Sequence, residues 1–136
     1  MTNFDEYRDV FVVADTIDDV VHPVTYELIG QARRIAKELG QLVQVMLLGE
    51  NVQAEAEELV AHGADIVHVF ESPLLKYYTT DGYTKVLTDF FEDHKPNILL
   101  IGATNNGRDL APRMSGRMQN GVVADCTILT VDTEEG

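Results

Sequence analysis

The chain has 136 residues, of which 45% are hydrophobic, so it is the size of one domain with enough apolar side chains for one core. It carries 10 basic and 23 acidic residues, which gives a net charge of −13. A surface this acidic repels phosphate backbones and anionic lipid, and the sequence has no basic stripe that would neutralise them. Composition therefore excludes nucleic-acid binding and indicates a soluble domain.

Cysteine content and hydropathy indicate the cellular compartment in which the protein is expected. The single cysteine, Cys126, excludes an internal disulfide and fits a reducing compartment. The polar, acidic residues 1–8 show no signal-peptide pattern. No apolar run approaches the roughly 20 residues of a membrane span. We expect a cytoplasmic protein of bacterial type.

The first third of the chain predicts a strand, a loop and a helix. Residues 10–14 are continuously apolar, which is typical of a strand covered on both faces. Residues 15–19 form a polar loop. Apolar residues at helical spacing then predict a helix over residues 23–39, with Pro23 in its first turn and Gly40 as a left-handed cap.

The middle of the chain repeats this alternation. Residues 42–48 predict the second strand, and apolar residues between 52 and 60 predict a helix that ends at Gly63. Residues 66–70 predict the third strand. A third helix places its apolar residues between 83 and 91 on one face.

The last third of the chain contains the most apolar of the predicted strands. Residues 94–96 end the third helix, because a proline disfavours helix in the residue before it. Residues 97–101 predict the fourth strand, and residues 110–119 a fourth helix with Asn120 and Gly121 as its exit. Residues 126–131 predict the fifth strand, in which Cys126 is expected to pack.

Strands that alternate with helices indicate an α/β fold with a parallel sheet of about five strands and helices on both faces. We expect a three-layer, doubly wound, Rossmann-like sheet, and right-handed crossovers restrict its topology to a few strand orders. Such sheets bind ligands at the carboxyl ends of the strands, where the strand order reverses. In a 3-2-1-4-5 order that point lies between the first and fourth strands, which makes loops 15–22 and 102–108 the candidate site.

The second loop carries the most distinctive sequence, Gly-Ala-Thr-Asn-Asn-Gly-Arg-Asp-Leu-Ala-Pro-Arg over residues 102–113. Gly102 lets the backbone turn off a buried strand, and Gly107 permits a positive φ or a close backbone approach. Thr104 offers a short polar side chain to the backbone or to a ligand. Arg108 is placed to reach an anion or a partner carboxylate.

The rest of the loop can be read as the start of a helix. Asp109 is expected to cap that helix, with Pro112 in its first turn, and Asp109 and Arg113 have the spacing of a helical ion pair. A turn, a cap and an ion pair account for most of these residues, and a ligand or interface role remains open beside that interpretation. Neither the dinucleotide glycine pattern nor the P-loop pattern is present.

Other candidates are weak, and we expect no catalytic residue and no metal site. The four histidines have no metal-ligand spacing: His22, His62, His68 and His94. His62 beside Gly63 is typical of a helix C-terminus. The acidic residues Asp15, Asp18 and Asp19 are interpreted as a solvated turn. The tyrosines between 77 and 83 are expected to pack at the start of a helix rather than to form a base-stacking platform. The Gly-x-Ser-x-Gly motif of a nucleophilic serine is not present in the sequence.

The 102–113 segment resembles the signature of electron transfer flavoprotein alpha subunits. The likeness extends to residues 27–32, to Gly-Ala-Asp at 63–65 and to Gly-Val-Val-Ala-Asp-Cys-Thr at 121–127, and it covers the chain from about residue 10 to residue 129. The local sequence in these segments is similar to that of the anaerobic, bifurcating branch of the family.

The resemblance implies an adenine nucleotide alpha hydrolase-like scaffold and docking domain in an electron carrier rather than an enzyme. Residues 1–136 would be the N-terminal domain of the alpha subunit, with the C-terminal FAD-binding domain absent from this chain. FAD is expected in that other domain, and AMP or a second FAD in the beta subunit, the partner. Acyl-CoA dehydrogenase-type or other redox proteins are further expected partners, and this chain alone would hold no cofactor.

Two alternatives remain. One is a stand-alone module of the same superfold that binds an adenine nucleotide in the crevice between the first and fourth strands. The other is a nucleotide-dependent ligase of this superfold, but Asp-Thr-Ile-Asp at residues 15–18 replaces the pyrophosphatase loop expected after the first strand.

Overall fold

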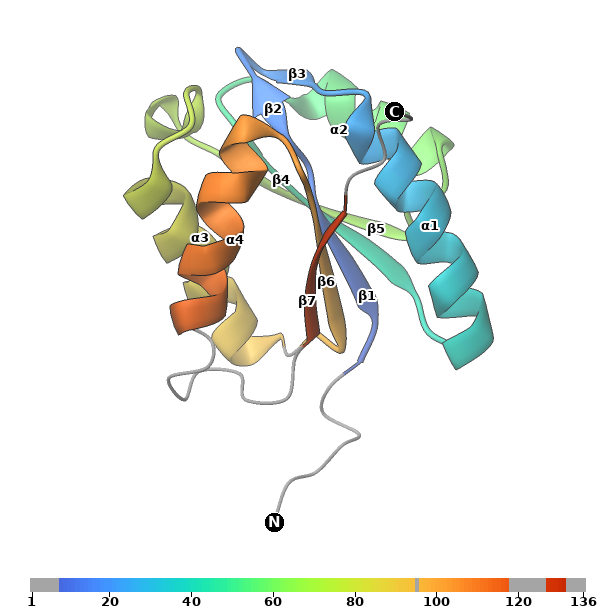
Figure 1. Ribbon diagram of the computed structural model, residues 1–136. Helices are drawn as coiled ribbons and strands as arrows, with labels where there is room; N and C mark the ends of the chain where they lie inside the picture. Colours follow the sequence, from blue (N-terminus) through green and yellow to red (C-terminus); the bar gives the residue numbers. More distant parts are fainter. Residues whose placement is uncertain (1–7, 95, 118–126, 132–136) are drawn as a thin grey trace.

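A five-stranded parallel sheet forms the centre of the computed structural model, which describes residues 8–94, 96–117 and 127–131 (Figure 1). The strand order is β5-β4-β1-β6-β7, and all four pairings are parallel. In sequence order this is 3-2-1-4-5, the doubly wound order used above to locate the candidate site, and the predicted fold class is confirmed. The strands are β1 (Val10–Val13), β4 (Val43–Gly49), β5 (Ile66–Glu71), β6 (Ile98–Gly102) and β7 (Thr127–Val131).

Helices cover both faces of the sheet and complete three layers (Figure 1). One face carries α1 (Val24–Leu39) and α2 (Gln53–Ala61), and the other carries α3 (Thr80–Asp93) and α4 (Asn105–Arg117). A short 3-10 turn, η2 (Pro73–Leu75), leads into α3. In the described part of the chain, no helix combines the length and apolarity that crossing a membrane requires.

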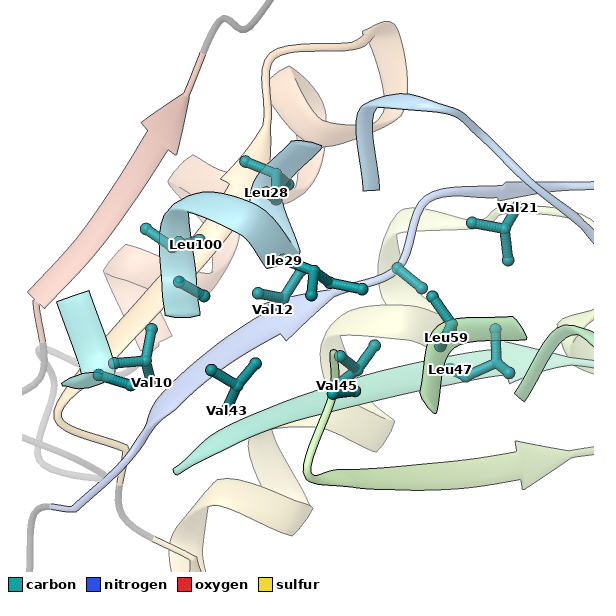
Figure 2. Close-up of a cluster of buried hydrophobic side chains, with 14 of the residues drawn as sticks. Val10, Val12, Val21, Leu28, Ile29, Val43, Val45, Leu47, Leu59 and Leu100 are labelled. Atoms are coloured by element: carbon teal, nitrogen blue, oxygen red, sulfur yellow. The ribbon is translucent and has the colours of Figure 1, made fainter. Parts of the chain in front are cut away.

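The α1 face of the sheet is sealed by aliphatic side chains. Leu28 and Ile29 of α1 are fully buried, and Figure 2 shows Ile29 over Val12 of β1 and Leu28 toward Leu100 of β6. Burying each such side chain stabilises the fold by about 1.5–3 kcal/mol. The helix ends at Gly40, whose φ of 67° confirms the predicted left-handed cap.

The opposite face of the sheet is packed by aromatic residues from α3. Phe91 is fully buried and meets Phe11 of β1 edge to face, with ring centroids 5.3 Å apart. Leu87 and Leu99 fill the space beside them. Two separate cores therefore hold the carboxyl edges of β1 and β6 in a fixed position.

The loop expected at residues 15–19 is partly a β-hairpin, so that prediction was wrong. Strands β2 (Thr16–Ile17) and β3 (Val20–Val21) pair antiparallel across a turn in which Asp18 and Asp19 have φ of 53° and 65°. Asp tolerates the left-handed region because its side chain can bond locally. Here the Asp19 carboxylate accepts hydrogen bonds from the N–H groups of Glu50 (2.8 Å) and Asn51 (3.1 Å), which anchors the hairpin to the β4–α2 loop.

The fourth helix also begins earlier than predicted. It starts at Asn105 rather than at residue 110, so Pro112 lies well inside it and not in its first turn. The predicted helix end and exit at residues 118–121, and the predicted start of the last strand at Cys126, lie outside the described residues.

Candidate functional site

The β6–α4 junction is closed by two glycines. A Cβ on Gly107 would lie 1.8 Å from the carbonyl oxygen of Gly102, so only glycine lets α4 start against the end of β6. Gly102 is itself tight, since a Cβ there would lie 3.1 Å from Val24 of α1. Of the two roles predicted for Gly107, the structure therefore selects the close backbone approach.

Thr104 caps the helix that was expected to be capped by Asp109. Its hydroxyl accepts a hydrogen bond from the Gly107 N–H at 3.0 Å, and its carbonyl accepts the first helical bond from Arg108 at 2.8 Å. A side-chain oxygen that bonds the third N–H of a helix is the usual N-cap arrangement. The cap prediction for Asp109 was wrong because this threonine takes the role five residues earlier.

Asp109 instead joins α4 to the start of α3. Its Oδ2 accepts hydrogen bonds from the Tyr78 hydroxyl at 2.7 Å and from the Thr80 hydroxyl. These two donors lower the pKa of Asp109, the Thr80 bond most. Burial, and next the bond to the Asp109 carboxylate, raise the pKa of Tyr78 to about 12. The Tyr78 phenol therefore stays protonated and the carboxylate ionised over the physiological range.

A second contact between these helices involves Arg113. Its guanidinium lies 3.3 Å from the Asp81 carboxylate, so the predicted Asp109–Arg113 ion pair is replaced by one to α3. Both partners are largely exposed, and such a pair contributes about 0–1 kcal/mol. Arg108 is exposed on the same helix. The outward side of the loop thus presents charged side chains on a backbone fixed by Gly107.

Among the described residues, side chains of the protein itself occupy the crevice between β1 and β6. The buried Tyr83 donates a hydrogen bond to the Leu75 carbonyl at 2.9 Å and lies 3.4 Å from the Thr16 hydroxyl. With Tyr78 it walls a cavity of about 20 Å³ between Ala14 and Gly107. That space holds about one water, whereas small-ligand pockets measure roughly 300–1,000 Å³.

The predicted site residues therefore separate into two groups. Gly102, Thr104 and Gly107 shape the junction, while Arg108, Asp109 and Arg113 lie exposed on α4. The sequence did not indicate that Tyr78, Thr80 and Asp81 would join them, because these residues precede Asp109 by about thirty positions. Of the three tyrosines expected to pack at a helix start, Tyr78 and Tyr83 do so, whereas Tyr77 is exposed.

Similarity to solved structures defines the class of fold. The chain resembles a universal stress protein from Archaeoglobus fulgidus solved in complex with dAMP, with a TM-score of 0.58 at 15% identity over 93% of this chain and 98% of that one. A second universal stress protein, solved with cAMP, gives a TM-score of 0.56, also at 15% identity, over 94% of this chain and 99% of that one. The fold is thus of the Rossmann-like, adenine nucleotide alpha hydrolase-like type.

The sequence places the chain in a particular family within this fold. Residues 10–135 match the family model of the electron transfer flavoprotein domain, and the chain belongs to that family. It is 45% identical over 96% of its length to an electron transfer flavoprotein subunit alpha of Megasphaera elsdenii, of which it spans 38%. It is 47% identical over 90% of its length to the lactate dehydrogenase (NAD(+),ferredoxin) subunit LctC of Acetobacterium woodii, of which it spans 29%.

Proposed function

We propose that this chain is the N-terminal scaffold and docking domain of the alpha subunit of a heterodimeric electron transfer flavoprotein. The complex carries electrons from dehydrogenases to a downstream acceptor through FAD. The flavin is held in a part of the full-length subunit other than residues 1–136, and the domain described here supplies rigid shape rather than redox chemistry.

The filled crevice is the observation that carries this proposal. In open parallel sheets the carboxyl edge is where ligands bind, yet here Tyr83 and Tyr78 occupy it and leave about 20 Å³. A flavin or a nucleotide needs far more room. A member of a flavoprotein family whose crevice is closed is best suited to contact a partner with its outer surface.

The docking surface we propose is the outward side of the 102–113 loop. Arg108, Asp109 and Arg113 are exposed there, and contacts to Tyr78 and Asp81 fix two of them. Side chains held in place lose less entropy when a partner binds. The partner is the beta subunit, with its AMP or second FAD.

Co-expression of a full-length version with its beta subunit tests the proposal. The expected product is a yellow heterodimer with bound FAD, and the isolated residues 1–136 are expected to be colourless. Arg108→Glu in the full-length chain should weaken assembly of the heterodimer, with Lys85→Glu on α3 as the matched control. A colourless heterodimer, or a yellow isolated domain, would contradict the proposal.

The alternative is a stand-alone adenine-nucleotide module, which the similarity to nucleotide-bound universal stress proteins favours. This alternative requires the crevice to open and Tyr83 to leave it. Calorimetric titration of residues 1–136 with AMP separates the two functions. Heat from stoichiometric binding would support the module, and the scaffold proposal expects none.

A further inference from the structure

Positive charge gathers at the end of α1, on the far side of the sheet from α3 and α4. Three of the ten basic residues in the chain, Arg33, Arg34 and Lys37, lie within five positions and are exposed. Within the described ranges, no carboxylate lies within 4.0 Å of their cationic nitrogens. On a molecule with a net charge of −13, this cluster is a local region of the opposite sign.

The three side chains border an open groove of about 400 Å³. Its other walls come from the start of β4, at Val43, and from the α2–β5 connection, at Gly63 and Asp65. The groove therefore lies at the amino edge of the sheet, at the end of α1 that is remote from the filled crevice (Figure 1).

Part of the groove wall is fixed in position. The Arg33 guanidinium donates a hydrogen bond to the Gly63 carbonyl at 3.4 Å, and a Cβ on Gly63 would lie 2.5 Å from the Arg33 side chain. Gly63 thus allows the arginine to lie across the loop. The Asp65 carboxylate accepts a hydrogen bond from the Val43 N–H at 2.9 Å. Three cations and one engaged carboxylate leave the groove positive.

We propose that this groove, called here the α1 basic groove and formed by Arg33, Arg34, Lys37, Gly63 and Asp65, binds an acidic polypeptide segment of a partner protein. Charge complementarity selects the occupant. Because the rest of the molecule is acidic, an acidic partner is repelled elsewhere and is steered to this edge. The inference is independent of the function proposed above, which uses the opposite edge.

The geometry favours a polypeptide over other anions. A compact phosphate is usually bound by backbone N–H groups at a helix N-terminus, whereas the residues that line this groove come mainly from the C-terminal half of α1, from β4 and from the α2–β5 connection. A nucleic acid needs a basic stripe to release counterions, and three cations on an acidic molecule do not provide one. Arg33 and Lys37, four residues apart, suit carboxylates spaced along an extended segment.

The test is the binding of a fluorescein-labelled peptide of alternating Asp and Glu to residues 1–136, followed by anisotropy at low salt. The structure predicts binding that Arg34→Glu/Lys37→Glu weakens by about tenfold, because two attractive charge contacts with the peptide become repulsive. Arg33 is left intact because it bonds to Gly63. The control Lys76→Glu/Lys85→Glu changes the net charge equally and should bind as the parent does.

Each other outcome decides against the groove. Absence of binding by the parent, an equal loss in both double variants, or stronger competition from inorganic phosphate or a single-stranded oligonucleotide than from unlabelled peptide would overturn the proposal. Arg34→Gln/Lys37→Gln, which keeps two helix-forming residues, should give an intermediate loss. Circular dichroism verifies that each variant is folded.

Discussion

The contact of Gly107 with the Gly102 carbonyl sets how closely α4 approaches the sheet. Only a hydrogen fits between them, since an added Cβ would lie 1.8 Å from the oxygen. Neither partner is the flexible end of a side chain, so relief of the clash requires movement of the strand or of the helix. The geometry of the whole 102–113 loop therefore depends on one absent methyl group.

Gly107→Ala is expected to destabilise the domain by about 1–3 kcal/mol or more, because the new methyl group overpacks a fixed backbone contact. Urea unfolding measures the change. Gly116→Ala is the matched control in the same helix, since its Cβ would meet nothing within 4 Å. That substitution should stabilise by up to about 1 kcal/mol through helix propensity. Equal effects at the two positions would contradict the close approach.

The half-buried Tyr78, which also bonds Asp109, gives the domain a dependence of stability on alkaline pH. The pKa of Tyr78 is raised from 10.0 to about 12, chiefly by burial. A raised folded-state pKa contributes stability that is complete below pH 10 and is lost as the pH rises towards 12. The free energy of unfolding should therefore fall more steeply across this window in the parent than in Tyr78→Phe. Parallel pH profiles for the two proteins would refute this.

The sequence could not predict which side chains of different helices and strands contact one another. Tyr78 and Asp109 meet because α3 and α4 pack side by side, and their separation of 31 residues carries no local signal. Thr104 can bond the backbone, but the cap that the sequence predicts is Asp109, an acid three residues before Pro112. The choice failed because the helix continues through Pro112.

At the scale of elements, the carboxylate of Asp19 in the β2–β3 hairpin anchors the hairpin to the β4–α2 loop. Asp19 accepts bonds from the Glu50 and Asn51 N–H groups just before α2, while Glu71 accepts from the Val52 N–H at 3.0 Å. Val52, at the N-cap of α2, has no side-chain cap. The N–H groups just before this helix therefore donate to carboxylates of the β2–β3 hairpin and of β5, which are distant in sequence.

Asp19→Ala should cost about 1–3 kcal/mol, because two amides lose their acceptor and alanine is disfavoured at a φ of 65°. Urea unfolding gives the loss, and faster hydrogen exchange at Glu50 and Asn51 locates it. Asp19→Asn keeps the left-handed preference and one acceptor oxygen, so it should lose less. Unchanged exchange at both amides in Asp19→Ala would show that the carboxylate does not anchor the hairpin.

The hairpin was missed for a physical reason. Two Asp residues between β-branched pairs are a weaker turn signal than a pair containing glycine, and the strands are only two residues long. Helix α4 illustrates the same point, since its first turn is polar and lacks the apolar periodicity that identified the other helices. Short or polar elements depend on distant partners, which no local pattern contains.

At the scale of the whole molecule, the sequence predicted the sheet well. Fully buried central strands are continuous apolar runs, and the most apolar, β6, pairs with β1 as the 3-2-1-4-5 order requires. The location of the crevice followed from that order. Whether it is open or closed did not, because closure depends on how η2 and α3 carry the two tyrosines over it.

A closed crevice predicts that ligands leave the thermal stability of the isolated domain unchanged. A ligand that binds only the folded state raises the melting temperature in proportion to ln(1 + [L]/Kd). Thermal unfolding of residues 1–136 with AMP or with FAD should therefore match unfolding without either. Addition of the purified beta subunit to the full-length chain is the positive control. A shift that grows with AMP concentration would show that the crevice opens.

The Tyr83 side chain occupies the place at the crevice where a ligand could bind, and it is covalently part of the chain. Tethering sets its effective concentration at the crevice by chain geometry, independently of how dilute the protein is. A free adenine nucleotide would have to outcompete an occupant that can never diffuse away and that also contributes to the folded core. Entry of a nucleotide would therefore carry the energetic cost of moving the buried Tyr83 side chain out of the core.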